Sequence, residues 1–162
     1  IMKKTHFITQ GAIIAAMYVV LTLVANAMNL ASGVIQVRLS EALTVLPYFT
    51  FSAVPGLFIG CIISNLITGA VIWDVIFGSL ATLIGALITY ALRKKSMYLA
   101  PLGPIAANTV VVPFVLSYAY GLKDAMWFMF LTVGAGEIIS CGVLGIFLLK
   151  ALKRHGGSMF DR

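Results

Sequence analysis

Residues 74–95 of the chain read DVIFGSLATLIGALITYALRKK, and this stretch decides the fold class. After Asp74 no charged side chain follows until Arg93, so the stretch is one apolar run with charges only at its ends. A helix needs about 20 predominantly apolar residues to cross the hydrocarbon core of a bilayer. Asp74 is favourable near a helix N-terminus, and the basic run 93–95 marks the other end. The stretch therefore predicts a transmembrane helix.

The composition of the whole chain agrees with this prediction. Of the 162 residues, 61% are hydrophobic and 10% are charged, whereas soluble domains carry about 25% charged residues. A single membrane domain over residues 1–162 is the unit that this length predicts. The net charge of +6 does not predict nucleic-acid binding, because the basic residues lie at segment ends rather than along one helix face. We expect an all-α, polytopic membrane protein.

Further apolar segments lie on both sides of this stretch. We expect helices over residues 6–28, 40–54, 56–68, 74–92, 101–118 and 124–152. The first segment runs on into the rest of the protein and is predicted to be a first span rather than a removable signal peptide. The second and third are short for a full span, and Pro47 should kink the second or open its hydrogen bonds. Ser40 is the predicted N-cap of the second helix, and Pro101 is a favourable first-turn residue of the fifth.

The distribution of basic residues predicts the orientation of these segments. Six spans place both termini on one side, and with that side inside the cell the basic residues are strongly biased toward it. The inner ends carry Lys3, Lys4, Arg93, Lys94, Lys95, Lys150, Lys153, Arg154 and Arg162, and the outer loops carry only Arg38 and Lys123. We therefore expect six transmembrane helices with both termini cytoplasmic.

Polar side chains within or beside the apolar segments are the candidate ligand contacts, because burying them in a bilayer is costly. Glu137 lies in the middle of the last segment and has either a structural partner or a ligand. Glu41 and Asp74 fall at outer helix ends, where each is either a helix-terminal charge or a ligand contact. Arg38 is three residues from Glu41 and pairs either with it or with a ligand. The full candidate set is Arg38, Glu41, Asn65, Trp73, Asp74, Asn108 and Glu137, and such a set suits a pocket for a flat, polar ligand.

Small residues on the first segment predict a close helix contact. Ala12 and Ala16 are four residues apart, and such pairs let helix backbones approach closely. The contact is either internal packing or docking of another membrane subunit, and the spacing alone leaves both open.

The sequence lacks the motifs of ATP hydrolysis and of common hydrolytic enzymes. It has no G-x-x-x-x-G-K-[ST] phosphate loop, no H-E-x-x-H and no G-x-S-x-G. Cys61 and Cys141 lie in apolar stretches and are predicted to be buried thiols rather than a disulfide or a metal site. We therefore expect neither catalysis nor a cofactor.

Three runs of the sequence closely resemble the signature of the QueT family. They are residues 36–47, QVRLSEALTVLP, residues 53–61, AVPGLFIGC, and residues 74–83, DVIFGSLATL. The resemblance covers nearly the whole chain and implies a substrate-specific (S) component of an energy-coupling factor (ECF) transporter in a prokaryotic plasma membrane. Such a component has six helices, binds a vitamin-like molecule on its outer side, and docks on a transmembrane coupling subunit with two ATP-binding subunits. The family's docking motif on the first helix corresponds to Ala12 and Ala16.

The resemblance also implies a ligand, because the QueT family is assigned to queuosine precursors, which carry a 7-deazaguanine ring. The amide N–H and the exocyclic amine of this ring form an edge with two hydrogen-bond donors. A carboxylate can accept from both, and either Glu41 or Glu137 is expected to bind this edge. The precursor amine is cationic, and Asp74 is its expected partner. Trp73 is expected to stack on the ring.

The remaining candidates complete this expected site. Asn65 and Asn108 are assigned to the ring carbonyl and nitrogen, and Arg38 either to the carbonyl oxygen or to the orientation of Glu41. Residues 29–39 are the expected lid. Which queuosine precursor is bound stays open, and a proton-coupled secondary transporter working through Glu137 is the alternative function.

Overall fold

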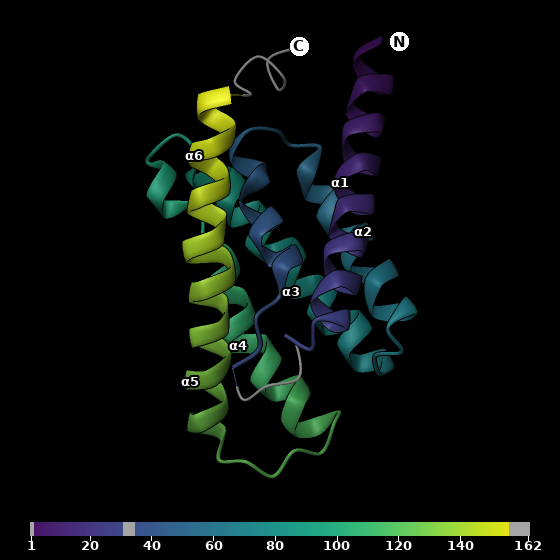
Figure 1. The fold of residues 1–162 in the computed structure, drawn as a ribbon, viewed down its shortest axis with the longest axis vertical. Helices are drawn as coiled ribbons and strands as arrows, with labels where there is room; N and C mark the ends of the chain where they lie inside the picture. Colours follow the sequence, from purple (N-terminus) through teal and green to yellow (C-terminus); the bar gives the residue numbers. More distant parts are fainter. Residues whose placement is uncertain (1, 31–34, 156–162) are drawn as a thin grey trace.

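The computed structural model describes residues 2–30 and 35–155, and every regular element within them is a helix (Figure 1). The elements are α1 (Met2–Ala27), the 3₁₀ helix η1 (Leu39–Tyr48), α2 (Ala53–Ile67), α3 (Ile72–Leu92), the 3₁₀ helix η2 (Met97–Leu99), α4 (Leu102–Tyr118), α5 (Met126–Glu137), the π-helix η3 (Ile138–Leu144) and α6 (Gly145–His155). Four runs are long and apolar enough to cross a membrane: Lys3–Ala27, Ile72–Leu92, Met97–Tyr118 and Met126–His155. The all-α class is confirmed, whereas the count of six spans stays a prediction.

The second predicted segment forms a 3₁₀ helix, not an α-helix. η1 begins after Arg38, so the predicted N-cap is wrong: Ser40 lies inside the helix and is buried. Thr44 Oγ1 donates to the Glu41 carbonyl at 2.5 Å, so the side chain competes for a carbonyl that would accept a backbone N–H in an α-helix. Pro47 has no N–H to donate to an α-helical hydrogen bond. These two features favour the tighter geometry. A 3₁₀ run of ten residues is uncommon and is often found at functional positions.

Neighbouring helices enclose η1. η1 contacts α1, α2, α3, α4, η3 and α6, and seven of its residues are buried. Irregular backbone is tolerated at membrane depth only where protein surrounds it. The bundle thus holds a short, polar-lined helix at its centre, between α1 and the α5–α6 rod in Figure 1.

The last predicted segment is one continuous helical rod from Met126 to His155. It begins two residues after the predicted start at Asp124, and it contains the π-helical turn of η3. The wider turn of a π-helix re-aims the side chains that follow it, and such turns are frequent at functional sites. Ser140 and Cys141 of η3 are buried against η1.

Glycines allow α1 and α2 to pack backbone against backbone. A Cβ atom added at Gly56 would lie 2.6 Å from the carbonyl oxygen of Gly11, and one at Gly60 would lie 2.9 Å from Cβ of Tyr18. In a bilayer such close approach supplies much of the association energy between helices. Sequence analysis predicted a close helix contact at Ala12 and Ala16, whereas the small residues of α1 that meet α2 are Gly11 and Ala15.

Gly56→Ala is therefore expected to lower the melting temperature of the detergent-purified protein. The added methyl group meets backbone, which cannot turn aside, and such overpacking costs about 1–3 kcal/mol. Gly142→Ala is the matched control, because its Cβ would stand 3.7 Å from the nearest side-chain atom, an ordinary contact. Equal melting temperatures for the two variants would show that the α1–α2 contact is not tightly packed.

The two ends of the bundle differ in charge. α1 begins and α6 ends at the same end of the molecule (Figure 1), and η2, which follows α3, contacts α6 there. The basic residues at these helix ends are Lys3, Lys4, Arg93, Lys94, Lys95, Lys150, Lys153 and Arg154. The predicted cytoplasmic residue Arg162 lies outside the described residues. The positive-inside rule places this basic end in the cytoplasm, and that orientation stays a prediction.

Candidate functional site

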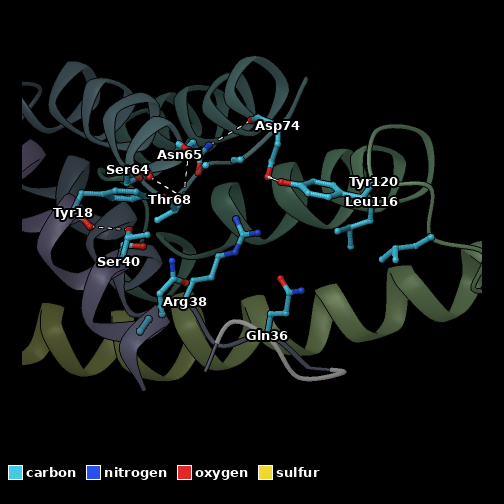
Figure 2. Close-up of a pocket in the computed structure, with 16 residues that line it drawn as sticks. Tyr18, Gln36, Arg38, Ser40, Ser64, Asn65, Thr68, Asp74, Leu116 and Tyr120 are labelled. Carbon is cyan, nitrogen blue, oxygen red and sulfur yellow. Dashed lines mark hydrogen bonds between the residues drawn. The ribbon is translucent and has the colours of Figure 1, made fainter. Parts of the chain in front are cut away.

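A polar cavity of about 410 Å³ lies at the end of the bundle opposite the termini (Figure 2). Its walls come from the last turns of α1, from the segment 36–40, from the end of α2, from the start of α3 and from the turn after α4. Pockets of this size hold small organic ligands. The structure therefore offers a ligand-sized space with hydrogen-bonding walls.

Arg38 contributes the positive charge of the cavity. Its side chain extends into the space toward Asp74 (Figure 2). Its backbone N–H donates to Ser140 Oγ at 3.1 Å, which fixes the residue on the α5–η3–α6 rod. Among residues 2–30 and 35–155, no hydrogen bond or ion pair is formed by the guanidinium, so the predicted pairing with Glu41 is not observed. The nearby carboxylates of Asp74, Glu41 and Glu137 favour the positive charge of the guanidinium.

Asp74 contributes a carboxylate to the opposite wall. It lies in the first turn of α3, it is 8% exposed, and its Oδ2 accepts a hydrogen bond of 2.8 Å from the Tyr120 hydroxyl. The pKa of Tyr120 is raised by partial burial and by this hydrogen bond, so the phenol stays protonated and keeps donating at neutral pH. Asn65, also in the wall, donates to the Asp74 backbone carbonyl at 3.4 Å.

Glu41 lies beneath the cavity rather than in its wall. The side chain is 1% exposed; Oε1 accepts from the Tyr18 hydroxyl at 2.6 Å and Oε2 from Asn108 Nδ2 at 3.2 Å. Tyr18 and Ser40 line the cavity above this network. The structure thus brings the predicted residues Glu41 and Asn108 together, but as a buried hydrogen-bonded pair under the floor.

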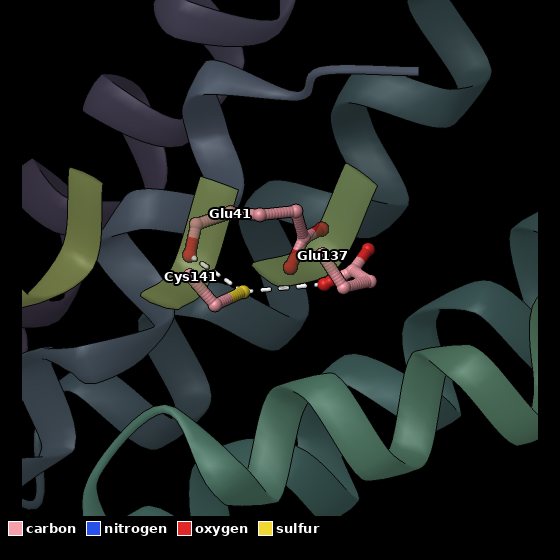
Figure 3. Close-up of side chains that lie close together, drawn as sticks. All are labelled: Glu41, Glu137 and Cys141. Atoms are coloured by element: carbon pink, nitrogen blue, oxygen red, sulfur yellow. Dashed lines mark hydrogen bonds between the residues drawn. The ribbon is translucent and has the colours of Figure 1, made fainter. Parts of the chain in front are cut away.

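Glu137 faces a second, smaller space. It is 6% exposed and lines a side pocket of about 30 Å³ together with Gln36 and Arg38. Figure 3 shows the Cys141 thiol between the two glutamates: Sγ donates to Glu137 Oε2 at 3.2 Å and contacts the Glu41 backbone carbonyl at 3.4 Å.

Metal-ligating atoms of Glu41, Glu137 and Cys141 lie within 4.8 Å of one another. Both carboxylate oxygens of Glu41 already accept hydrogen bonds, and the thiol is engaged as a donor. A hydrogen-bonded cluster accounts for this geometry, and we assign no metal to it.

Trp73 does not reach the cavity. It is 55% exposed, its ring stacks on Phe77 with centroids 6.0 Å apart, and it lines an apolar groove on the lateral surface with Phe114 and Tyr118. The aromatic rings that do line the cavity are those of Tyr18 and Tyr120. Sequence analysis did not predict Tyr18 as a contact. A signal was present, because Tyr18 and Thr22 are polar residues one helical turn apart in an apolar helix and therefore lie on the same face.

The predicted lid falls partly outside the described residues, since residues 31–34 are not among them. Of the rest of that segment, Gln36 and Arg38 line the cavity, and Val37 N–H donates to the Leu30 carbonyl at 3.0 Å.

Four helical runs that are long and apolar enough to cross a membrane, together with a ligand-sized cavity with hydrogen-bonding walls, are the features of a multi-pass membrane protein with a candidate site for a small molecule. The chain matches the family described as QueT transporter over residues 8–154 and belongs to that family. The resemblance of the three sequence runs is thereby confirmed. The family is one of transporters, which favours a transport role over catalysis.

One curated relative is the Queuosine precursor transporter QueT of Lactococcus lactis subsp. cremoris, which is 40% identical over 82 residues. The match spans 51% of this chain and 48% of the relative, so it covers about half of each protein. No solved structure matches the chain.

Proposed function

We propose that the chain is the substrate-binding subunit of an ATP-driven, ECF-type importer that takes up a queuosine precursor with a 7-deazaguanine ring. The observation that carries the proposal is the polar cavity at the end opposite the basic helix ends. With the basic end in the cytoplasm, the cavity faces the outside, where an importer meets its substrate. The name of the Lactococcus relative supports the class of ligand.

The charges of the cavity suit a queuosine precursor that carries an amine. The Asp74 carboxylate is a partner for the cationic amine, and the Arg38 guanidinium is a donor for the ring carbonyl. Asn65 adds an amide to the same wall. Tyr18 and Tyr120 replace Trp73 as the aromatic contacts in this assignment.

Calorimetric titration of the detergent-purified chain tests the proposal. The ligands are 7-aminomethyl-7-deazaguanine, its 7-cyano precursor, queuine and guanine. Tight binding of a deazaguanine with no partner present is the expected result, and the ranking identifies the precursor. A folded protein that binds none of the four would overturn the assignment of the ligand.

The exposed face of α1 supports a docking role for Ala12 and Ala16. Both are exposed, whereas Gly11 and Ala15 on the neighbouring face pack against α2. Internal packing therefore uses the other small residues of α1. A smooth, exposed strip lets another membrane helix approach closely. Because the chain has no phosphate loop, the energy of ATP hydrolysis has to come from partner subunits reached through such a face.

Ala12→Leu combined with Ala16→Leu is expected to leave ligand affinity unchanged and to lower ATP-dependent uptake in vesicles by about fivefold or more, because the added volume overpacks the helix contact. Ile13→Phe is the control, since it enlarges an exposed side chain of α1 on an adjacent face. Full uptake by the double variant would contradict the docking role. Uptake in vesicles lacking any ATP-binding subunit would instead favour a proton-coupled secondary transporter.

A further inference from the structure

Three residues separate the cavity from the side pocket that contains Glu137. Gln36, Arg38 and Leu116 line both spaces, so they form a partition with the cavity on one side and the Glu137 carboxylate on the other. Two members of this partition are long polar side chains that point from the segment 36–38 into the interior (Figure 2).

The two buried glutamates differ in their capacity to accept further hydrogen bonds. Glu41 uses both oxygens for Tyr18 and Asn108 and lines none of the described cavities. Glu137 accepts from the Cys141 thiol, a weak donor, and borders the side pocket. A carboxylate offers about four lone-pair positions. Glu137 therefore has acceptor positions that border open space, whereas both oxygens of Glu41 are hydrogen-bonded and border neither the cavity nor the side pocket.

The size of the side pocket shows that a ligand reaches Glu137 only if the partition moves. A volume of about 30 Å³ accommodates one or two water molecules and no ring. Moving Arg38 and Gln36 would join this space to the cavity of about 410 Å³. The movement works against the attraction of the Arg38 charge to the Asp74 and Glu41 carboxylates. The Arg38 backbone stays anchored on Ser140.

We propose that the side pocket is the subsite that reads the two-donor edge of the 7-deazaguanine ring through Glu137, and that Arg38 is the movable partition that admits this edge. This assignment rests on the proposed function, and it gives the contact with the two-donor edge of the ring to Glu137 rather than to Glu41. The ligand's orientation follows from charge. Arg38 repels the cationic amine and keeps it near Asp74, while the neutral ring edge passes Arg38 and reaches Glu137.

A ligand that lacks one donor of the edge tests the subsite. The wild-type chain is titrated with 7-aminomethyl-7-deazaguanine and with the analogue lacking the exocyclic 2-amino group. The wild type is expected to prefer the complete ligand by about tenfold or more, because a hydrogen bond to Glu137 is lost. In Glu137→Gln this preference should fall to about twofold or less. Asp124→Asn, which removes an exposed carboxylate outside both spaces, should keep the wild-type preference.

The association rate tests the partition. Arg38→Ala should bind the 7-cyano ligand faster than the wild type, because no side chain has to move before the ring enters. This ligand is neutral, so loss of the Arg38 charge does not itself speed association. An association rate equal to or slower than that of the wild type would refute the partition role of Arg38.

The outcomes separate this inference from the proposed function. If the wild type binds no deazaguanine, both fail. If it binds the complete ligand and its 2-desamino analogue equally, or if Glu137→Gln keeps the wild-type preference, the edge-reading subsite is wrong and the S-component assignment stands.

Discussion

Asp74→Asn is expected to weaken binding of 7-aminomethyl-7-deazaguanine by about 30-fold or more. The Asp74 carboxylate is 8% exposed and lines the cavity, so an ion pair formed there would be largely shielded from water. Removing one partner of a buried, hydrogen-bonded charge pair costs about 2–5 kcal/mol. Asparagine keeps the size of the side chain and removes only the charge. Isothermal titration of the wild type and the variant measures the difference.

The neutral 7-cyano ligand and a second aspartate provide the controls. The 7-cyano ligand has no cation to lose, so its affinity should change by about threefold or less in Asp74→Asn. Asp124 is exposed in the turn before α5 and does not line the cavity, so Asp124→Asn should bind both ligands like the wild type. Equal losses of affinity for the charged and the neutral ligand in Asp74→Asn would show that Asp74 does not contact the amine.

The long helices were predictable because apolar length is a local property of the sequence. The stretch 74–92 predicted α3 to within two residues of its observed bounds, Ile72–Leu92. The 3₁₀ geometry of η1 was not predicted, although Pro47 indicated a disturbed helix. It depends on the Thr44 side chain competing for a backbone acceptor and on the helices that enclose η1, and neither is visible in hydrophobic periodicity.

The direction of a side chain around its helix decided which candidates reach the cavity. Consecutive residues of an α-helix point about 100° apart. Asp74 faces the cavity, and the adjacent Trp73 therefore faces the lateral surface. The sequence analysis placed both at the correct end of the bundle but did not assign their directions. Asp74, Thr82 and Thr89 lie at helical spacing on one buried face of α3, and this spacing is the signal that could have separated Asp74 from Trp73.

Contacts between segments far apart in the sequence were beyond local patterns. Ser140 Oγ accepts the Arg38 N–H across 102 residues, and Cys141 contacts the Glu41 carbonyl across 100. The π-helical turn that aims Ser140 and Cys141 has no recognised sequence signature in this chain. The choice between Glu41 and Glu137 as the ligand contact rests on contacts of the same kind, the hydrogen bonds of Glu41 to Tyr18 and Asn108 across 23 and 67 residues, which is why the sequence left it open.

Gly136→Ala is expected to weaken ligand binding by about tenfold or more. A Cβ atom at this position would overlap the carbonyl oxygen of Gln36, so the segment 36–38 would have to move away from α5. That segment carries Gln36 and Arg38 into the cavity and into the partition before Glu137. Small displacements of ligand-contacting groups lose much of their interaction energy.

Gly134→Ala is the matched control for this prediction. It places the same methyl group one half-turn away on α5, where the nearest atom is a Thr109 methyl at an ordinary 3.4 Å. Melting temperatures of both variants are measured together with their ligand affinities, because overpacking at Gly136 also costs stability, by about 1–3 kcal/mol.

If Gly136→Ala is too unstable to titrate, Ser140→Ala removes the second anchor of the segment, the hydrogen bond to the Arg38 N–H, without adding volume. Wild-type affinity in a folded Gly136→Ala or Ser140→Ala protein would show that the rod does not position Arg38. Weaker binding in both variants, with Gly134→Ala unchanged, would establish that two residues of the rod, one helical turn apart, hold Arg38 in the cavity wall.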